Sequence, residues 1–292
     1  MKNVFNFDMN ELTYVTEQRC PQCGGEMRAW IIKDGMKPRG GQVCMSLEVI
    51  DGKERWGGCH YRMQLKKEAE SVAMLLNQSM EQKAYGYLVQ NSIVPNEKIL
   101  GRQLDGFITQ DRETKQALDM SRYAAQECAN GEIVHALYLG KTGTGKTHLA
   151  VGVAREMMRL SKFTKNAMFI SYPEYYAIVK SFYQVKEAAR IVELEVMAEV
   201  KKADLVILDD LGAENSEICG DKKPTDNNIQ MLTRILDARE EKNLIITSNL
   251  TGQDISDMYG DRIFSRIRSN LKTKHGNERI IQLKDTNDFR AR

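Results

Sequence analysis

The sequence predicts an α/β protein in which a parallel sheet is flanked by helices and preceded by a small cysteine-bearing module. From about Glu132 onward, short apolar runs alternate with helical segments, which is typical of parallel strands covered on both faces. A glycine-rich phosphate-binding pattern separates the first apolar run from the next helix. Four of the six cysteines lie near the N-terminus, between Cys20 and Cys59. These three observations define the predicted architecture.

The bulk composition is that of a globular protein and excludes few functions. Of 292 residues, 42% are hydrophobic and 28% are charged, and the net charge is +2. This balance argues neither for nor against nucleic acid, because a basic surface could be local. The sequence has no apolar run of about 18 residues, and its first residues, MKNVFNFDMNEL, lack the apolar core of a signal peptide. We therefore expect a cytoplasmic protein without membrane contact.

The clustered cysteines predict a zinc-binding module in residues 1–65. Cys20 and Cys23 form a C-x-x-C pair, and Cys44 and Cys59 follow after 20 and 14 further residues. Four thiolates complete a tetrahedral structural zinc site, and in a reducing compartment such a cluster favours metal over disulfides. His60 is an alternative fourth ligand. Free thiols or a redox pair are the alternatives to zinc.

Residues 66–105 are predicted to form a helical linker. In the stretch 66–90 apolar residues recur at every fourth position, with Lys, Glu and Gln between them. The recurring residues are Val72, Leu76, Met80, Ala84 and Leu88. Such a face packs either on the helix's own domain or on a partner protein, so the linker is a candidate partner-binding segment.

Residues 106–292 are expected to contain the sheet. The apolar runs predict strands at residues 136–139, 167–170, 205–208, 244–246 and 280–283. Helices are predicted between them, including residues 147–162 and 228–242. In the first of these helices, four apolar side chains share one face: Ala150, Val153, Met157 and Leu160.

The phosphate-binding pattern is a full G-x-x-x-x-G-K-T at residues 140–147, after a predicted strand and before a predicted helix. Its glycines let backbone N–H groups converge on phosphate oxygens, and the helix N-terminus adds its positive dipole end. Lys146 is expected to reach the β- and γ-phosphates of ATP, and Thr147 to bind Mg²⁺. The alternative is a chance glycine-rich turn. The predicted nucleotide-binding residues are Gly140, Lys141, Thr142, Gly143, Thr144, Gly145, Lys146, Thr147 and His148.

Polar side chains follow two of the predicted strands. Asp209 and Asp210 end a buried apolar run, where a charged pair is costly unless something compensates it. We assign Asp209 to magnesium, with Thr147, and Asp210 to polarising the attacking water. Asn249 ends the next strand and is expected to orient that water or contact the γ-phosphate. The alternative for each is a strand that simply ends in a polar turn.

Together these motifs resemble the AAA+ ATPases of the DnaC/DnaI helicase-loader and IstB group, over roughly residues 92–292. Residues 260–268, GDRIFSRIR, are similar to the box that carries an arginine finger in that group. The resemblance implies that Arg266 is the finger, supported by Arg262, and that the protein self-assembles in an ATP-dependent way. A solvated basic helix face is the alternative. The C-terminal segment implies that Arg290 contacts phosphate, although Arg279 competes for this role.

The cysteine module resembles the zinc-bearing N-terminal part of DnaI-type loaders, which contacts the helicase. DnaC-type and IstB-type chains generally lack it, which favours a loader over a transposition helper. Two features depart from the pattern. Asp210 stands where many AAA+ enzymes have glutamate, which fits slow turnover. Residues 214–227 are longer and more polar than usual.

Loaders of this group also contact single-stranded DNA. Lys180, Phe182 and Tyr183 are our candidates for that contact, because aromatic rings beside lysine can stack bases and neutralise phosphates. Packing in the core is the alternative.

The leading hypothesis is an ATPase that loads the replicative DNA helicase onto single-stranded DNA, with bound ATP, Mg²⁺ and Zn²⁺. An IstB-like helper of a DNA transposase is the second hypothesis. A P-loop kinase and a catalytically silent adaptor are the others.

Overall fold

The computed structural model describes residues 13–30, 43–50, 53–56, 59, 61–215, 223–269, 271–273, 276, 278–284 and 286. The chain divides into two compact units, residues 1–76 and 77–292. Each unit is considered by itself below. The domain boundaries expected at residues 65 and 105 remain predictions.

The first unit is built from short antiparallel strands. β1 (Thr13–Arg19), β2 (Glu26–Trp30) and β3 (Val43–Cys44) form a three-stranded sheet in that order. β4 (Leu47–Ile50) pairs with β5 (Lys53–Trp56) in a separate hairpin. Between β1 and β2 the chain turns sharply, because the Gly24 N–H donates to the Cys20 carbonyl and Gly24 has a φ of 72°. This turn carries two of the cysteines.

The second unit contains the predicted parallel sheet. Its strands are β6 (His135–Gly140), β7 (Ala167–Ser171), β8 (Leu205–Leu211), β9 (Asn243–Ser248) and β10 (Ile280–Leu283). They lie in the order β10-β6-β9-β8-β7, and every neighbouring pair is parallel. The prediction of an α/β fold with a parallel sheet flanked by helices is confirmed, and all five predicted strands fall within these elements.

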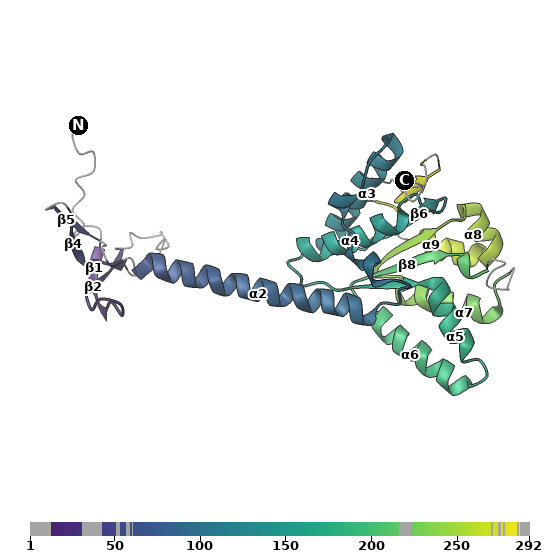
Figure 1. The fold of residues 1–292 in the computed structure, drawn as a ribbon, viewed down its shortest axis with the longest axis horizontal. Coiled ribbons are helices and arrows are strands. Elements are labelled where there is room, and N and C mark those ends of the chain that lie inside the picture. The colour runs from purple at the N-terminus through teal and green to yellow at the C-terminus, as the bar shows by residue number, and fades with distance from the viewer. Residues whose placement is uncertain are drawn as a thin grey trace. The chain divides into compact units, whose positions relative to one another are not determined.

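The central residues of β6, β7, β8 and β9 are apolar because these strands are buried on both faces. In β6, for example, Tyr138 belongs to one buried cluster while its neighbours Leu137 and Leu139 belong to another. The first cluster also contains residues of α3 (Arg112–Ala129) and α4 (Lys146–Leu160). The second cluster contains residues of α5 to α9 (Figure 1). Those helices are α5 (Tyr172–Ser181), α6 (Lys186–Lys202), α7 (Asp226–Ala238), α8 (Gly252–Tyr259) and α9 (Asp261–Arg268).

The predicted linker contains α2 (Tyr61–Asn91), which begins before and ends just after the helical pattern of residues 66–90. Its apolar stripe is divided between two environments. Ala84 and Leu88 are buried in the core of the second unit, whereas Val72 and Leu76 are 56% and 62% exposed. The stripe therefore packs on its own domain only in its C-terminal part. In the described part of the chain, no helix is both long and apolar enough to cross a membrane.

Short 3-10 helices connect α2 to α3 and follow β8. They are η1 (Glu97–Gly101), η2 (Leu104–Gly106) and η3 (Ala213–Asn215). Asp111 caps α3 through a reciprocal capping box with Thr114, which satisfies N–H groups that a helix start leaves unpaired.

Candidate functional site

The phosphate loop connects β6 to α4 at the carboxyl edge of the sheet. Two of its glycines are required by their surroundings. A Cβ on Gly140 would lie 2.4 Å from the Leu283 carbonyl oxygen, and one on Gly145 would lie 2.6 Å from Cε2 of Phe107. Gly145 also has a φ of 91°, a left-handed conformation that only glycine adopts readily. The loop therefore keeps its curl against β10 and Phe107.

Lys146 lies at the base of this loop and is only 5% exposed. Its Nζ donates hydrogen bonds to the carbonyls of Gly140 and Lys141 and to Oδ1 of Asn249, each at 2.8 Å. The structure thus brings together two of the predicted catalytic side chains, one from the residue after β9 and one from the start of α4. A buried ammonium held by neutral oxygens is well placed to receive a phosphate, because a charged acceptor makes a stronger hydrogen bond than a neutral one.

Asp209, near the end of β8, lies beside Thr147 in the first turn of α4. The Thr147 hydroxyl donates to Asp209 Oδ1 at 2.9 Å, and the Thr247 hydroxyl donates to the same oxygen at 2.7 Å. Burial, and next the charge of Asp210, raise the pKa of Asp209 to about 6, while the two hydroxyl donors and Lys146 oppose the rise. A buried carboxylate next to a hydroxyl fits Mg²⁺, because a cation would offset both causes of the raised pKa.

Asp210 has a left-handed backbone, with a φ of 56°. Such a φ is uncommon for a residue with a side chain, and it is often found at functional sites. It coincides with a shift in the pairing register of β8 and β9 between Leu208 and Leu211. The Asp210 N–H donates to the Thr247 hydroxyl at 2.9 Å, which holds the irregular turn in place. Asp210 is partly exposed, and it lines the same cavity as Asp209.

A cavity of about 550 Å³ joins these groups, a volume within the range of small-molecule sites. Its lining includes six of the predicted nucleotide-binding residues together with Asp209, Asp210 and Asn249. The six are Thr142, Gly143, Gly145, Lys146, Thr147 and His148. Thr144 acts differently: it is buried and its hydroxyl donates to the Lys141 carbonyl at 2.9 Å, which stabilises the loop.

The cavity also has a wall that motif reasoning missed. It consists of Pro95, Ile99, Arg102, Gly106, Phe107, Ile108 and Ser171. The Phe107 ring meets the His148 ring edge-on at 5.4 Å between centroids, and His148 Nε2 lies 2.8 Å from the Gln103 carbonyl. The sequence motifs assigned no role to the segment of residues 95–108, which supplies most of this wall. Its apolar residues, which precede α3 and β6, could have indicated a wall for a nucleotide base.

The predicted arginines lie elsewhere. Arg266, on α9, forms a salt bridge of 2.9 Å with Asp237 on α7 and does not line the cavity. Arg262 is exposed on α9. Arg279 is buried and its guanidinium donates to both carboxylate oxygens of Glu127, so this arginine is engaged away from the phosphate loop. Arg290 lies outside the described residues.

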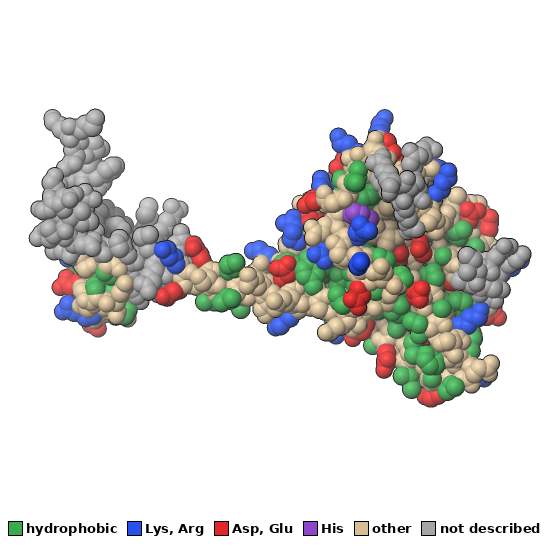
Figure 2. All heavy atoms as spheres, viewed as in Figure 1, with side chains coloured by type: hydrophobic (Ala, Val, Ile, Leu, Met, Phe, Trp, Pro, Cys, Tyr) green, Lys and Arg blue, Asp and Glu red, His purple; other side chains and the backbone are tan. Residues whose placement is uncertain are grey.

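The candidates for DNA contact lie at the end of α5. Lys180 Nζ is 5.7 Å from the centroid of the Tyr176 ring, and Phe182 is 39% exposed. Tyr183 lines a second cavity of about 1000 Å³ between α6 and α7. Figure 2 shows hydrophobic side chains gathered over α5 and α6. The neighbouring tyrosines Tyr172, Tyr175 and Tyr176 are buried in the core.

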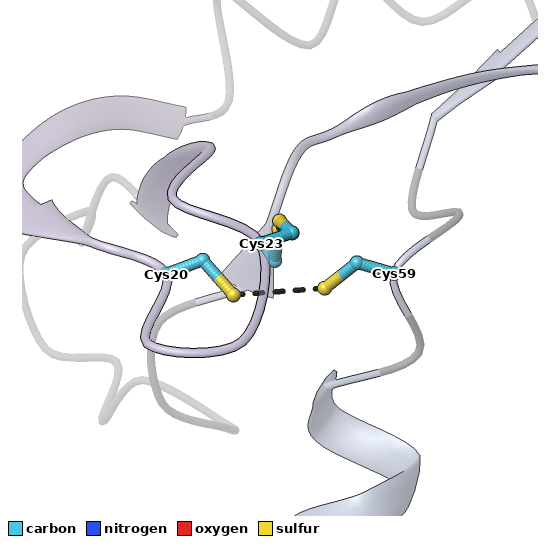
Figure 3. A group of neighbouring side chains, drawn as sticks. Cys20, Cys23 and Cys59 are labelled. Atoms are coloured by element: carbon cyan, nitrogen blue, oxygen red, sulfur yellow. Dashed lines mark hydrogen bonds between the residues drawn. The ribbon is translucent and has the colours of Figure 1, made fainter.

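The four predicted zinc ligands converge in the first unit. All four Sγ atoms lie within 4.8 Å of one another, with 3.6 Å between Cys20 and Cys59 and 3.5 Å between Cys23 and Cys44. Figure 3 shows the side chains of Cys20 and Cys59 pointing toward each other beside Cys23. A tetrahedral site with Zn–S bonds of about 2.3 Å requires S···S distances of about 3.8 Å, so the cluster fits zinc.

The sulfur environment agrees with this fit. Burial raises the pKa of the Cys20 thiol, but the backbone N–H groups of Cys23 and Gln22 and the neighbouring thiols outweigh it and lower the pKa to about 7. Zinc binds the thiolate form of cysteine. His60, the alternative ligand, lies outside the described residues.

Comparisons with known proteins agree with the motif reading. A model of the family described as IstB-like ATP binding protein matches residues 104–270. The replicative helicase loader DnaC of Escherichia coli (strain K12) is 21% identical over 201 residues, which cover 69% of this chain and 73% of DnaC. The uncharacterized protein YdaV of the same strain is 23% identical over 193 residues, covering 62% of this chain and 71% of YdaV.

Solved structures are also similar. A crystal structure of DnaI aligns with a TM-score of 0.49 at 23% identity, covering 65% of this chain and 92% of that chain. The family model contains the phosphate loop, both aspartates, Asn249 and the arginines of α9 within its matched region. Because that region spans more than half of the 292 residues, the chain belongs to the family of IstB-like ATP-binding proteins.

Proposed function

We propose that this protein hydrolyses ATP and uses the cycle to load a replicative DNA helicase onto single-stranded DNA. The observation that carries the ATPase part is the convergence of Lys146, Thr147, Asp209 and Asn249 on one cavity. Lys146 would exchange its carbonyl and amide partners for the β- and γ-phosphates. The apolar wall around Phe107 has the character expected for a nucleotide base.

Thr147 and Asp209 would hold Mg²⁺, which would supply neutralising charge at the phosphates. Asp210 would accept a hydrogen bond from the attacking water, and Asn249 would orient the terminal phosphate. The left-handed backbone at Asp210 interrupts the regular alternation of side chains along β8. The Asp210 carboxylate can therefore have a role separate from that of Asp209.

A hydrolysis assay tests the ATPase proposal. The wild-type protein should release phosphate from ATP, and Lys146→Ala should lose both tight nucleotide binding and turnover. Lys162→Ala is a matched control, because Lys162 is an exposed lysine just after α4. Hydrolysis by Lys146→Ala at the wild-type rate would contradict the proposal.

Self-assembly is proposed to bring Arg266 to the nucleotide of a neighbouring subunit. Its guanidinium does not reach the cavity of its own chain, so a role in hydrolysis would require a neighbouring subunit. An arginine supplied across an interface offsets charge developing on the transferred phosphoryl group.

Two features support a loader. The curated relative DnaC is a replicative helicase loader, and the cysteine cluster fits the zinc module that favours the DnaI-type layout. Pull-down of a replicative helicase in the presence of ATP or ADP tests the partner. Capture of a transposase in its place would favour the second function, which the match to the IstB-like family model keeps open.

Single-stranded DNA is the proposed nucleic acid. Tyr183 lines the second cavity beside four basic side chains, and two acidic ones reduce the excess of positive charge. The basic residues are Lys186, Arg190, Lys201 and Arg234, and the acidic ones are Glu193 and Asp237. Aromatic stacking with backbone neutralisation is the expected mode. Preference for duplex DNA, or unchanged binding by a Lys180→Ala, Phe182→Ala and Tyr183→Ala triple variant, would contradict it.

A further inference from the structure

One polar side chain in the nucleotide cavity has no role in the mechanism above. Ser171 is the last residue of β7, is 7% exposed and lines the cavity. Its backbone N–H donates to the Ile93 carbonyl at 2.8 Å. Its hydroxyl, however, makes no capping hydrogen bond to α5 and has no other hydrogen-bond partner among the described residues. Because Ser171 lines the cavity, this hydroxyl is available to donate to, and accept from, a molecule bound there.

The strand order determines which ligand the hydroxyl can meet. β7 is an edge strand, and Ser171 pairs in register with Asp209 on β8. The phosphate loop follows β6, which lies on the other side of β9. Across the carboxyl edge of the sheet, the order is therefore phosphate loop, Asn249, the two aspartates and Ser171. Ser171 lies on the side of the aspartates that is remote from the phosphate loop.

This order matters because phosphoryl transfer proceeds in line, with the nucleophile opposite the leaving group. The leaving phosphates would be held by the loop. The nucleophile must then approach from the side of Asp210 and Ser171. A serine hydroxyl both donates and accepts hydrogen bonds, so it can hold a water molecule while a carboxylate accepts that water's proton.

We propose that Ser171 positions the attacking water together with Asp210; this inference rests on the proposed ATPase function. In the step itself, the water oxygen bonds to the terminal phosphorus and the bond from that phosphorus to the bridging oxygen breaks. ADP leaves with the electron pair. The water proton passes to the Asp210 carboxylate and then to solvent, so the products are ADP and inorganic phosphate.

Steady-state kinetics of Ser171→Ala provide the first test. The value of kcat should fall about tenfold, as expected for one lost hydrogen bond in the transition state, with KM changed less than about twofold. Ser161→Ala is the matched control, because the Ser161 hydroxyl donates to the Met158 carbonyl at the end of α4, outside the cavity. A raised KM with unchanged kcat would make Ser171 a phosphate ligand and overturn the proposal, as would kinetics identical to wild type.

The partnership with Asp210 is tested by combining variants. If both residues act on one water, adding Ser171→Ala to Asp210→Ala should cause no further loss of kcat. A full additional tenfold loss would contradict a shared water. Wild-type protein without Lys146-dependent hydrolysis would overturn the proposed function, whereas normal wild-type hydrolysis with an unaffected Ser171→Ala variant would overturn this inference alone.

A binding measurement gives a readout that does not depend on turnover. Ser171→Ala should bind Mg²⁺-ADP as wild type does, which also shows that it is folded. It should capture Mg²⁺-ADP with aluminium fluoride about tenfold more weakly, because that complex imitates the transition state including its water. Equal capture by both proteins would contradict the proposal.

Discussion

The ionised carboxylate that Asp209 needs to hold Mg²⁺ lowers the stability of the nucleotide-free fold. The Asp209 carboxylate is 5% exposed and its pKa is raised to about 6, chiefly by burial. The folded state therefore holds this proton more tightly than the unfolded state does. As the pH rises from the unfolded pKa near 4 through the folded value, the stability that protonation of Asp209 contributes is lost.

We predict that Asp209→Asn stabilises the nucleotide-free protein above pH 7. A pKa shift of about two units corresponds to at most about 3 kcal/mol, so a gain of about 1–3 kcal/mol is expected at pH 7.5. The gain should shrink as the pH falls and disappear near about pH 3, where the wild-type carboxyl is protonated in both states. Urea unfolding at several pH values measures it. Asp119→Asn, an exposed carboxyl on α3, is the control, and a gain that does not vary with pH would contradict the explanation.

Among individual residues, the sequence predicted those site residues that belong to a short local motif. The phosphate loop is defined by spacing within eight positions, and the acids directly follow an apolar run, so their placement at one edge of the sheet could be inferred. Thr247, Ser171 and Phe107 were missed. Their proximity to the site depends on strand order and on packing between distant segments, neither of which is written in any one stretch of sequence.

Among the elements, η3 is fixed by a buried polar network around Glu214. This carboxylate is fully buried and accepts hydrogen bonds from the Gly212 N–H at 2.9 Å, the Asn215 amide at 2.9 Å and the Asn228 amide at 3.2 Å. The Tyr259 hydroxyl at the end of α8 also donates to it. Burial raises the pKa of Glu214, and the donors oppose the rise. The network connects the turn after Asp210 to α7 and α8.

We predict that Tyr259→Phe lowers the free energy of unfolding by about 1–3 kcal/mol, because a buried carboxylate loses one donor and keeps its desolvation cost. The ring and its packing remain, so the effect reports on the hydroxyl alone. Chemical denaturation measures it. Tyr123→Phe on α3 is the matched control, since that tyrosine is 43% exposed. Equal effects of the two substitutions would show that the Glu214 network contributes no stability.

The sequence predicted the elements themselves well wherever burial is uniform. Strands buried on both faces contain continuous apolar runs, which located β6, β7, β8 and β9, and the short run at residues 280–283 located β10. The segment that begins at Glu214 was noted only as long and polar. Its buried part could not be predicted, because a polar side chain enters a core only when partners from other elements satisfy it. The exposed apolar residues of α2, Val72 and Leu76, were likewise indistinguishable from core positions.

At the scale of the whole molecule, the two units are expected to fulfil separate tasks. The cysteine cluster lies within the first unit and the nucleotide cavity within the second. Among the described residues, the cysteine cluster has ligands only from the first unit, and the cavity is lined only by residues of the second unit. Zinc should therefore be needed for the integrity of the first unit and not for the chemistry of the second.

We predict that the purified protein contains one zinc ion per chain and that Cys23→Ser loses it, because three thiolates no longer close a tetrahedral site. Lys146-dependent hydrolysis should persist in the variant at low protein concentration, while capture of the helicase is lost. Metal analysis and phosphate release are the two measurements. Cys128→Ala, a buried cysteine on α3, should keep its zinc. Retention of stoichiometric zinc by Cys23→Ser would contradict the assigned ligand set.

The assembly itself can be tested through Arg266. Its salt bridge with Asp237 joins side chains that are 31% and 49% exposed, and such a pair contributes no more than about 1 kcal/mol. The charge of a neighbour's bound nucleotide can therefore displace Asp237 at little cost. Arg266→Ala should bind ATP normally yet hydrolyse it slowly. Arg268→Ala loses the pair with Glu278 and the cation–π contact with Phe264, both on its own chain, and should remain active.

Mixing two inactive variants separates a role across the interface from a role within one chain. Lys146→Ala retains Arg266 but cannot hold ATP productively, and Arg266→Ala has the opposite defect. If the guanidinium acts on the neighbouring subunit, mixed assemblies contain interfaces with one intact site and one intact arginine. Hydrolysis by the mixture should then exceed the sum of the two variants alone and should rise with protein concentration. Hydrolysis equal to that sum at every concentration would mean that Arg266 does not act in trans.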